Sequence, residues 1–268
     1  MTDSIQQSAQ RIIASLKRSY STPFTRRSAR ESDFGHLEMH AYRVFQMHHE
    51  AQGFRMLWDY EVAEVSDSPT TLIARTFIRS MVSTDGTIVA HYYQVRPRIS
   101  RLLRGLFRGL LNGRWIDTPR FFLKNLKTRH CNDYESECSD GGFITTSNAQ
   151  SAGMISPPPT VDSVYHPYGT PPMLLLADHK ERLAAWVAAH PGNSIRVVTS
   201  VSELQGMQNR LKEQKNAHRA AVSWVTESEL VKMSDANPAL ARAVYNEVQR
   251  QLRENPEPGA TPFETSSR

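Results

Sequence analysis

A cluster of cationic side chains interleaved with leucines is the feature of the sequence with the clearest chemistry. The range Arg96–Arg129, which we call the basic segment, holds ten Lys and Arg residues and one acid, Asp117, and so carries a net charge of +9. Apolar side chains recur within it at i, i+3, i+4 and i+7 from Ile99 to Leu111. This periodicity predicts a cationic amphipathic helix. Such a helix can bury its apolar face in a membrane interface while its arginines meet anionic headgroups.

We predict a non-catalytic interaction protein that docks from Arg98 to Arg129 onto an anionic membrane surface or an acidic protein partner. The side chains expected to make the contact are Arg98, Arg101, Arg104, Phe107, Arg108, Arg114, Trp115, Lys124 and Lys127. Two simpler explanations stay open: the segment packs as an ordinary surface helix, or the acids of His130–Phe143 fold over it and neutralise it. Nucleic acid is a less favoured partner, because the aromatic side chains do not alternate with the cations and no known nucleic-acid-binding motif occurs.

A second group of chemistry-bearing side chains lies around a proline-rich stretch. Tyr165, His166 and Tyr168 form a candidate ligand loop, because long ordered loops often carry function. An enzyme site would combine them with the hydroxyl run Thr145–Ser147 and with His179. The sequence contains no Gly-x-Ser-x-Gly elbow and no glycine-rich phosphate loop. We therefore expect no cofactor and no metal site, and catalysis is the alternative rather than the leading hypothesis.

The order of three short motifs along the chain is relevant to the catalytic alternative. Arg43, the strand Phe143–Ser147 and Glu227-x-Glu229 follow one another in an order that resembles the arginine, Ser-Thr-Ser, Glu-x-Glu order of ADP-ribosyltransferase toxins. The resemblance implies that Arg43 and the hydroxyl strand hold a nicotinamide cofactor and that Glu229 assists the transfer. The strand here reads Thr-Thr-Ser, and Thr226-x-x-Glu229 is also a capping box that would open a helix.

Composition limits the class of protein. The chain has 268 residues, of which 39% are hydrophobic and 22% charged, as in one large or two small globular domains. The longest uncharged apolar run, Leu183–Ala189, is too short to cross a bilayer. The first residues lack the pattern of a secretory signal, so we expect a cytoplasmic protein that can bind a membrane peripherally. Cys131 and Cys138, at the two ends of an acidic loop, are expected to be ordinary thiols, with a disulfide or a metal role as the alternatives.

The elements that position these residues fall into four ranges: 1–148, 149–172, 173–254 and 255–268. The first range should contain helices over 4–18 and Phe34–Gln52, followed by an antiparallel sheet. The expected strands are Met56–Val65, Leu72–Val82, Ile88–Val95 and Gly142–Ser147. The Asp85-Gly86 and Asp140-Gly141 pairs predict hairpins with type I′ turns, whose two central residues both have positive φ.

The second half of the chain reads differently. Six prolines in 149–172 predict a linker or loop with no regular element. A mainly helical part follows, with capping signals at Ser200-x-x-Glu203 and Asn237-Pro238, and with His218 and Leu240 on apolar stripes. Ile195–Thr199 should be a short strand, and 255–268 a disordered tail. The fold is therefore predicted to be α+β, with a central antiparallel sheet, N-terminal helices and a mainly helical C-terminal part.

Overall fold

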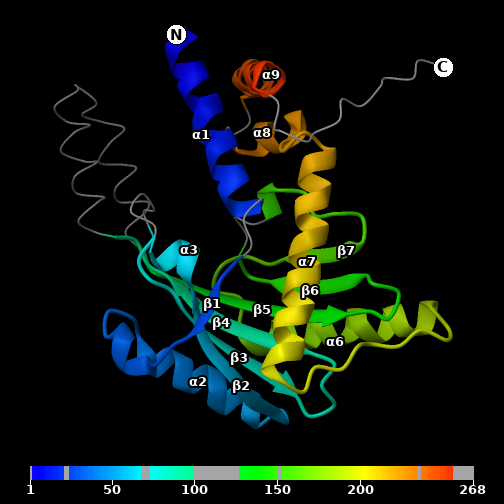
Figure 1. The fold of residues 1–268 in the computed structure, drawn as a ribbon. Helices are drawn as coiled ribbons and strands as arrows, with labels where there is room; N and C mark the ends of the chain where they lie inside the picture. Colours follow the sequence, from blue (N-terminus) through cyan, green and yellow to red (C-terminus); the bar gives the residue numbers. More distant parts are fainter. Residues whose placement is uncertain are drawn as a thin grey trace. The chain divides into compact units, whose positions relative to one another are not determined.

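The computed structural model describes residues 2–20, 24–67, 73–98, 127–149, 153–233 and 237–255, and it confirms the α+β fold (Figure 1). The strands are β1 (Arg26–Ser28), β2 (Phe54–Val62), β3 (Phe77–Ser83), β4 (Val89–Val95), β5 (Arg129–Glu137), β6 (Phe143–Ser147) and β7 (Val161–Tyr165). The helices are α1 (Thr2–Tyr20), the 3₁₀ helix η1 (Glu31–Phe34), α2 (Met39–Glu50), α3 (Ala63–Ser66), α6 (Pro172–Ala189), α7 (Val201–Ala221), α8 (Glu227–Met233) and α9 (Pro238–Glu254).

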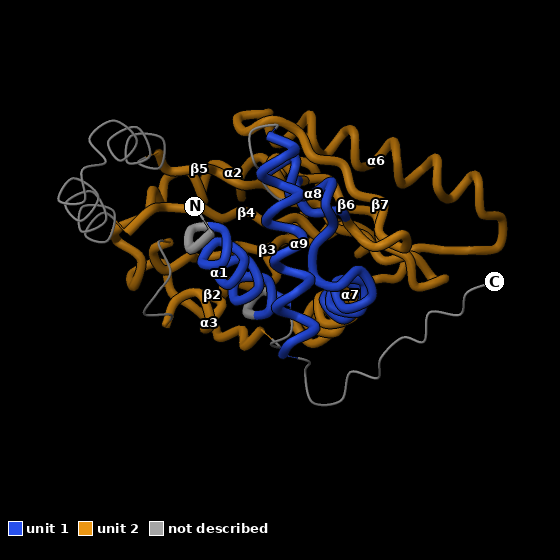
Figure 2. Tube along the Cα trace, turned by 90° about the horizontal axis from the view of Figure 1, so that it is seen from above, with its two compact units in different colours: residues 1–22, 154–156, 212–268 blue, residues 23–153, 157–211 orange. Residues whose placement is uncertain are grey.

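The chain divides into two compact units, which Figure 2 shows in different colours. Unit 1 comprises residues 1–22, 154–156 and 212–268, and unit 2 comprises residues 23–153 and 157–211. Helix α7 therefore gives its first half to unit 2 and its second half to unit 1. The proline-rich range 149–172 likewise contributes to both units, because 154–156 belongs to unit 1.

The sheet lies in unit 2, and its seven strands follow one another in chain order. Each neighbouring pair from β1 to β6 is antiparallel, whereas β7 runs parallel to β6 and makes the sheet mixed. Strand β7 lies within 149–172, where we expected no regular element. That expectation was wrong because the prolines frame the strand: Pro159 precedes Val161, and Pro167 follows Tyr165.

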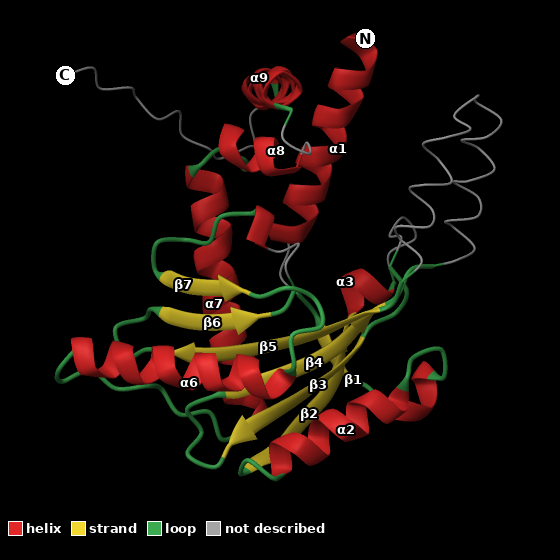
Figure 3. Ribbon diagram, turned by 180° about the vertical axis from the view of Figure 1, so that it is seen from behind, coloured by secondary structure: helices red, strands yellow, loops and turns green. Residues whose placement is uncertain are grey.

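Helices α2 and α6 cover one face of this sheet, as Figure 3 shows. Alternate side chains of the strands point to them, among them Phe77, Tyr92 and Tyr134. The first half of α7 packs on the opposite face through Leu204, Met207 and Leu211. The other side chains of the strands point to that opposite face, and among them are Ser80, His91, Asp133 and Ser147.

Both Asp-Gly pairs form hairpin turns, as predicted, but not turns of the expected type. Gly86 and Gly141 have φ of 75° and 90°, whereas the aspartates before them do not have positive φ. In each turn the glycine N–H donates to the carbonyl three residues earlier, at 2.8 and 3.0 Å. This is a turn closed by a left-handed glycine, in place of a type I′ turn with two such residues.

Other elements of unit 2 also differ from expectation. The predicted strand Met56–Val65 ends at Val62, and Ala63–Ser66 forms α3. The predicted helix Phe34–Gln52 begins only at Met39, because Phe34 and Leu37 turn into the core and the Leu37 N–H donates to the Phe34 carbonyl at 2.8 Å. The expected strand at 195–199 is reduced to a single bridge between Ile195 and Cys138.

In unit 1, α1 and α9 pack together over the expected lengths. The Asn237 side chain accepts the Leu240 N–H at 3.1 Å and so caps α9 as predicted. The predicted apolar stripes are displaced by one residue at two points. Leu240 is exposed and its neighbour Ala241 is buried, while on α7 the buried residue is Arg219 rather than His218.

Candidate functional site

The structure describes only the two ends of the basic segment. Residues 99–126 lie outside the described part of the chain, so the amphipathic helix stays a prediction. The predicted contact residues in that range are Arg101, Arg104, Phe107, Arg108, Arg114, Trp115 and Lys124. Val95 of β4 pairs with Arg129 of β5, so the segment leaves and re-enters the sheet at neighbouring positions. At its start the Arg98 guanidinium donates to the Ser66 carbonyl at 3.0 Å, and at its end Lys127 lies two residues before β5.

The candidate ligand loop lies beside this point of re-entry. The Arg129 guanidinium lies over the Tyr168 ring at 5.0 Å from its centroid, a cation–π geometry. His166 pairs with Asp178 of α6, with 3.1 Å between Nε2 and Oδ2, and its backbone N–H donates to the Ser147 carbonyl. Tyr165 is the last residue of β7. The structure thus places Tyr168 of the candidate ligand loop against Arg129, the last residue of the basic segment.

The hydroxyl run Thr145–Ser147 is split by strand alternation. Thr146 points to the α6 face, where its hydroxyl lies 3.1 Å from Nδ1 of His179. Thr145 and Ser147 point to the opposite face, so a site built on all three hydroxyls and His179 does not form. His179 is fully buried and its Nε2 lies 3.0 Å from the Ser136 hydroxyl. Burial lowers the pKa of His179 to about 4, so the ring is neutral.

The residues that resemble the ADP-ribosyltransferase order have other partners. Arg43 is an exposed residue of α2 that pairs with Glu31 at 3.1 Å. Glu229 is fully buried, and its carboxylate accepts hydrogen bonds from Arg219, from the Ser156 N–H and from the Thr226 N–H. A carboxylate committed in this way inside unit 1 is not available to a substrate. Its expected catalytic role is therefore replaced by the capping and pairing role.

A row of polar side chains crosses the α7 face of the sheet. Strand register places Ser80, His91, Asp133 and Ser147 next to one another on β3, β4, β5 and β6. The Ser80 hydroxyl lies 2.6 Å from Nδ1 of His91, and the Ser147 hydroxyl donates to Asp133. Nε2 of His91 lies 3.4 Å from a carboxylate oxygen of Glu135. Sequence reasoning missed this row, because its members meet only through long-range register.

The row resembles a serine–histidine–carboxylate arrangement but is closed to solvent. Ser80 and His91 are buried, and Gln208 of α7 lies 3.4 Å from Nε2 of His91. Burial also raises the pKa of the Asp133 carboxyl and the Tyr93 hydroxyl. The row therefore gives Ser80, His91 and Ser147 partners inside the sheet, which is the usual requirement for burying polar groups, whereas the side-chain oxygen of Gln208 is buried without a hydrogen-bond partner among the described residues.

The two cysteines are free and buried. The acidic stretch between them is strand β5 rather than the loop we expected, because its side chains alternate between the two faces of the sheet. Seven residues of extended chain separate the cysteines by about 23 Å, which excludes a disulfide between them. Burial raises the pKa of each thiol to about 12, so neither is an activated nucleophile.

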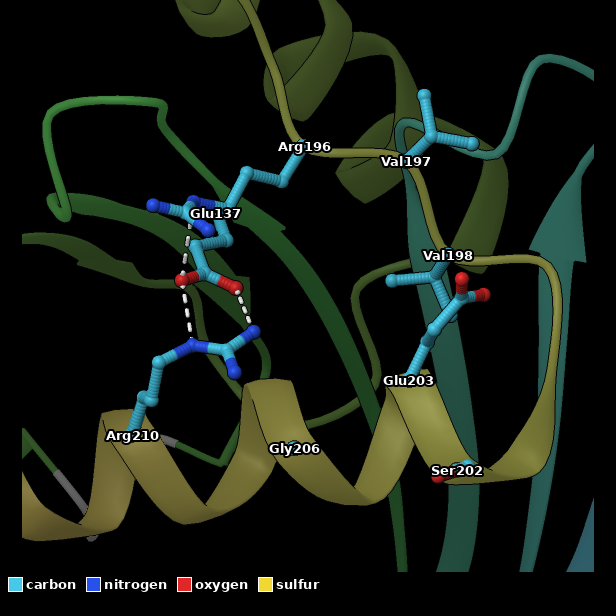
Figure 4. A pocket seen from close by; sticks show the side chains of 8 residues that line it. All are labelled: Glu137, Arg196, Val197, Val198, Ser202, Glu203, Gly206 and Arg210. Atoms are coloured by element: carbon cyan, nitrogen blue, oxygen red, sulfur yellow. Dashed lines mark hydrogen bonds and ion pairs between the residues drawn. The ribbon is translucent and has the colours of Figure 1, made fainter.

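A pocket of about 430 Å³ opens between the first turns of α7 and the chain just before that helix (Figure 4). Its lining residues are Glu137, Arg196, Val197, Val198, Ser202, Glu203, Gly206 and Arg210. Arg210 holds Glu137 through two hydrogen bonds of 2.7 and 2.6 Å, and Nε of Arg196 lies 3.4 Å from the same carboxylate. The sequence had shown only the capping function of Glu203, whose Oε2 accepts the Ser200 N–H at 3.0 Å.

Among the described residues, no group of three or more His, Cys, Asp or Glu side chains is arranged to hold a metal ion. Within the same residues, no helix is long and apolar enough to cross a bilayer. Comparisons of this chain with protein-family models, with curated proteins and with solved structures find no match.

Proposed function

We propose that this protein is a non-catalytic interaction protein that binds an anionic membrane surface through the basic segment. The observation that carries the proposal is a net charge of +9 within 34 residues, combined with an apolar stripe from Ile99 to Leu111. Basic residues close to an anionic leaflet contribute about 1 kcal/mol each. Four to six engaged cations would therefore contribute more than any single inserted leucine.

The position of the segment supports this proposal. It follows Val95 and ends at Arg129, and these two residues are paired on adjacent strands of a seven-stranded sheet. A long connection that starts and ends on a rigid element is a common way to present a binding surface. The Tyr168 ring against Arg129 adds an aromatic side chain beside the same end of the sheet.

The partners of the neighbouring acids also support it. If the acids of His130–Phe143 neutralised the basic segment, their carboxylates would pair with its cations. Glu137 instead pairs with Arg196 and Arg210. The charge of this acid is therefore compensated elsewhere in unit 2 and not by the basic segment.

The continuous apolar stripe favours a membrane over the other partners. An acidic protein or a nucleic acid would need the arginines but not seven apolar side chains at helical spacing. Binding to nucleic acid alone would fall steeply with salt, because it depends on the release of counterions. Insertion of the stripe would retain part of the binding at high salt, because apolar burial is not screened.

The first test is co-sedimentation of the full chain with anionic and with neutral liposomes, at low and high salt, with duplex DNA as competitor. We expect binding to anionic liposomes only, partly retained at high salt and resistant to DNA. Replacing Arg101, Arg104 and Arg108 by Glu should abolish it. Replacing the exposed residues Arg11, Arg242 and Arg253 by Glu changes the net charge by the same amount, and we expect this variant to retain most of the liposome binding.

The outcomes separate the alternatives. Binding that DNA displaces completely would identify a nucleic-acid protein. Absence of lipid binding together with capture by an acidic polypeptide would identify a protein partner instead. Equal losses in the two triple variants would contradict a dedicated docking segment, because net charge alone would then explain the binding.

A further inference from the structure

The end of the basic segment and the candidate ligand loop lie at one edge of the sheet. Strand β5 begins at this edge with Arg129. Strands β6 and β7 end there, because β6 runs antiparallel to β5 and β7 runs parallel to β6 (Figure 3). Only residues 166–171 separate β7 from α6, so the helix also begins close to this edge.

The connection from β7 to α6 and the first turns of the helix form an uncharged surface. No charged residue occurs from Pro167 to Ala177, and Pro167, Gly169 and Pro171 are exposed. Leu174 in α6 is 62% exposed, which is the highest value among the large apolar side chains that the structure describes. An exposed stretch without charges that includes such a leucine is typical of a contact surface.

The loop holds its side chains in a fixed arrangement. The Thr170 N–H and the Thr170 hydroxyl both donate to the Pro167 carbonyl, at 3.2 and 2.9 Å. Gly169 supplies the left-handed conformation that this turn needs, with φ of 91°. Proline at both ends of the turn restricts the backbone further. A preformed loop loses little conformational entropy on binding, so its exposed side chains can contribute fully to a contact.

Two cations lie beside the uncharged surface. The Arg129 guanidinium lies over the Tyr168 ring, and Lys127 is exposed two residues earlier in the chain. Among the described residues, no carboxylate pairs with either cation. Tyrosine is enriched where a membrane meets water, because its ring is apolar and its hydroxyl remains hydrated. An aromatic side chain next to such cations therefore fits the headgroup region of an anionic leaflet.

We propose that Tyr168 and Leu174, with Arg129 and Lys127 beside them, form a second contact with the anionic membrane. Tyr168 lies among the headgroups, Leu174 enters the acyl boundary, and the two cations pair with lipid phosphates. This inference rests on the proposed membrane binding, but Tyr168 and Leu174 lie outside the basic segment. Two contacts at one edge of the sheet also determine which edge faces the bilayer.

The first test is Leu174→Glu, which places a charge in the proposed acyl contact. We expect binding to anionic liposomes to weaken at least about tenfold, the effect of removing one inserted leucine. The matched control is Met47→Glu, because Met47 is 58% exposed and the change of charge is the same. Met47 lies in the last turn of α2, just before β2, which begins at the opposite edge of the sheet. This variant should bind nearly as well as the unmodified protein.

A fluorophore shows whether the first turn of α6 enters the bilayer. Cys131 and Cys138 are buried, so Leu174→Cys can be labelled selectively with a polarity-sensitive dye. We expect the emission of this label to shift to the blue when anionic liposomes are added. The same label on Met47→Cys should not respond.

Two variants test the aromatic side chain. Tyr168→Phe keeps the ring against Arg129 and should bind liposomes nearly as well as the unmodified protein. Tyr168→Ala removes the ring and should bind severalfold more weakly. Thermal unfolding shows whether each variant is folded. A glutamate at Leu174 is compatible with α6, because the N-terminus of a helix favours negative charge.

The outcomes distinguish this inference from the proposed function. If the unmodified protein binds anionic liposomes but the label at position 174 does not respond, the second contact is excluded and binding through the basic segment stands. Equal binding by Leu174→Glu and Met47→Glu would have the same meaning. If the unmodified protein binds no liposomes, the proposed function and this inference are both wrong.

Discussion

At the residue scale, unit 1 contains an ion pair that is almost completely buried. In unit 1 the side chains of Arg219 and Glu229 are 1% and 0% exposed and lie 2.9 Å apart. The guanidinium also donates to the Ser156 carbonyl at 2.7 Å, and the carboxylate accepts the N–H groups of Ser156 and Thr226. Removing one member of such a pair leaves the other as an unpaired buried charge, which costs far more than an exposed pair contributes.

We expect Glu229→Gln to lower the free energy of unfolding by about 3 kcal/mol, because Arg219 would stay buried without its counter-charge. Urea unfolding of the full chain measures the change. Glu227→Gln is the matched control, since it removes an exposed pair with Arg242 and should cost less than about 1 kcal/mol. Similar losses in both variants would show that Glu229 does not compensate a buried charge.

A serine with a left-handed backbone conformation follows helix α7. The Trp224 N–H donates to the Arg219 carbonyl at 2.6 Å and the Ser223 N–H to the Ala220 carbonyl at 3.1 Å, a Schellman motif. Its left-handed position is usually glycine but here is Ser223, with φ of 53°. Ser223→Gly should raise the free energy of unfolding by roughly 0.5 kcal/mol, because relief of the left-handed strain exceeds the added chain entropy. Ser228→Gly inside α8 should lower it, and thermal unfolding of the two variants checks the contrast.

At the scale of elements, the two Asp-Gly hairpins have the same turn but different surroundings. Gly86 and Gly141 both have positive φ. A Cβ on Gly86 would come within 2.5 Å of a Val197 methyl and 3.0 Å of the Val198 carbonyl, whereas nothing lies within 4 Å of one on Gly141. Gly141→Ala should therefore cost about 1 kcal/mol from backbone strain alone. Gly86→Ala should cost clearly more, because the Val198 backbone must also move.

Chemical denaturation of the two alanine variants gives the comparison directly. Equal losses of unfolding free energy would mean that the residues before α7 can move away from an alanine at position 86 without an energetic penalty. The close contact at Gly86 would then not contribute to the cost of the substitution. The paired design is useful because both substitutions change the unfolded chain in the same way.

These turns also show what the sequence predicts well. The hairpins, the capping boxes at Ser200 and Thr226 and the cap at Asn237 all form, because each depends on hydrogen bonds between residues at most five apart. Each motif carries its own local signal. The turn type was wrong because the backbone conformation at Asp85 depends on how the strands meet, which local pairs do not specify.

Strand β5 shows where that reasoning ends. Its acids suggested a loop, since carboxylates such as Glu137 are rarely buried. The burial of Glu137 is tolerated because its carboxylate pairs with Arg196 and Arg210, which follow it in the sequence by 59 and 73 residues. The pocket and the polar row from Ser80 to Ser147 are likewise assembled by register and by α7. No window of sequence contains those contacts, so the candidate sites were predicted less well than the helices.

At the scale of the whole molecule, buried histidines make the stability of unit 2 depend on pH. His49 is held by the Phe45 carbonyl at Nδ1 and the Tyr134 hydroxyl at Nε2, both at 2.8 Å. His179 is held by Thr146 and Ser136. Burial lowers the pKa of each ring to about 4, from 6.5 for an unburied histidine. The native protein therefore keeps both rings neutral where the unfolded chain takes up a proton at each.

The sign of the effect follows from this difference. The stabilisation is complete above pH 6.5 and is lost as the pH falls toward 4, by about 3 kcal/mol for each histidine. Asp133, whose carboxyl pKa is raised by burial, has the opposite effect on the pH dependence of stability. The contribution of each histidine is therefore measured by comparing the unmodified protein with a variant that lacks that histidine. His49→Gln and His179→Gln should each reduce the slope of unfolding free energy against pH by about one proton between pH 4.5 and 6. His190→Gln, at an exposed position, is the control. Urea unfolding at several pH values measures the slopes, and an unchanged slope in both buried variants would assign the acid sensitivity to other groups.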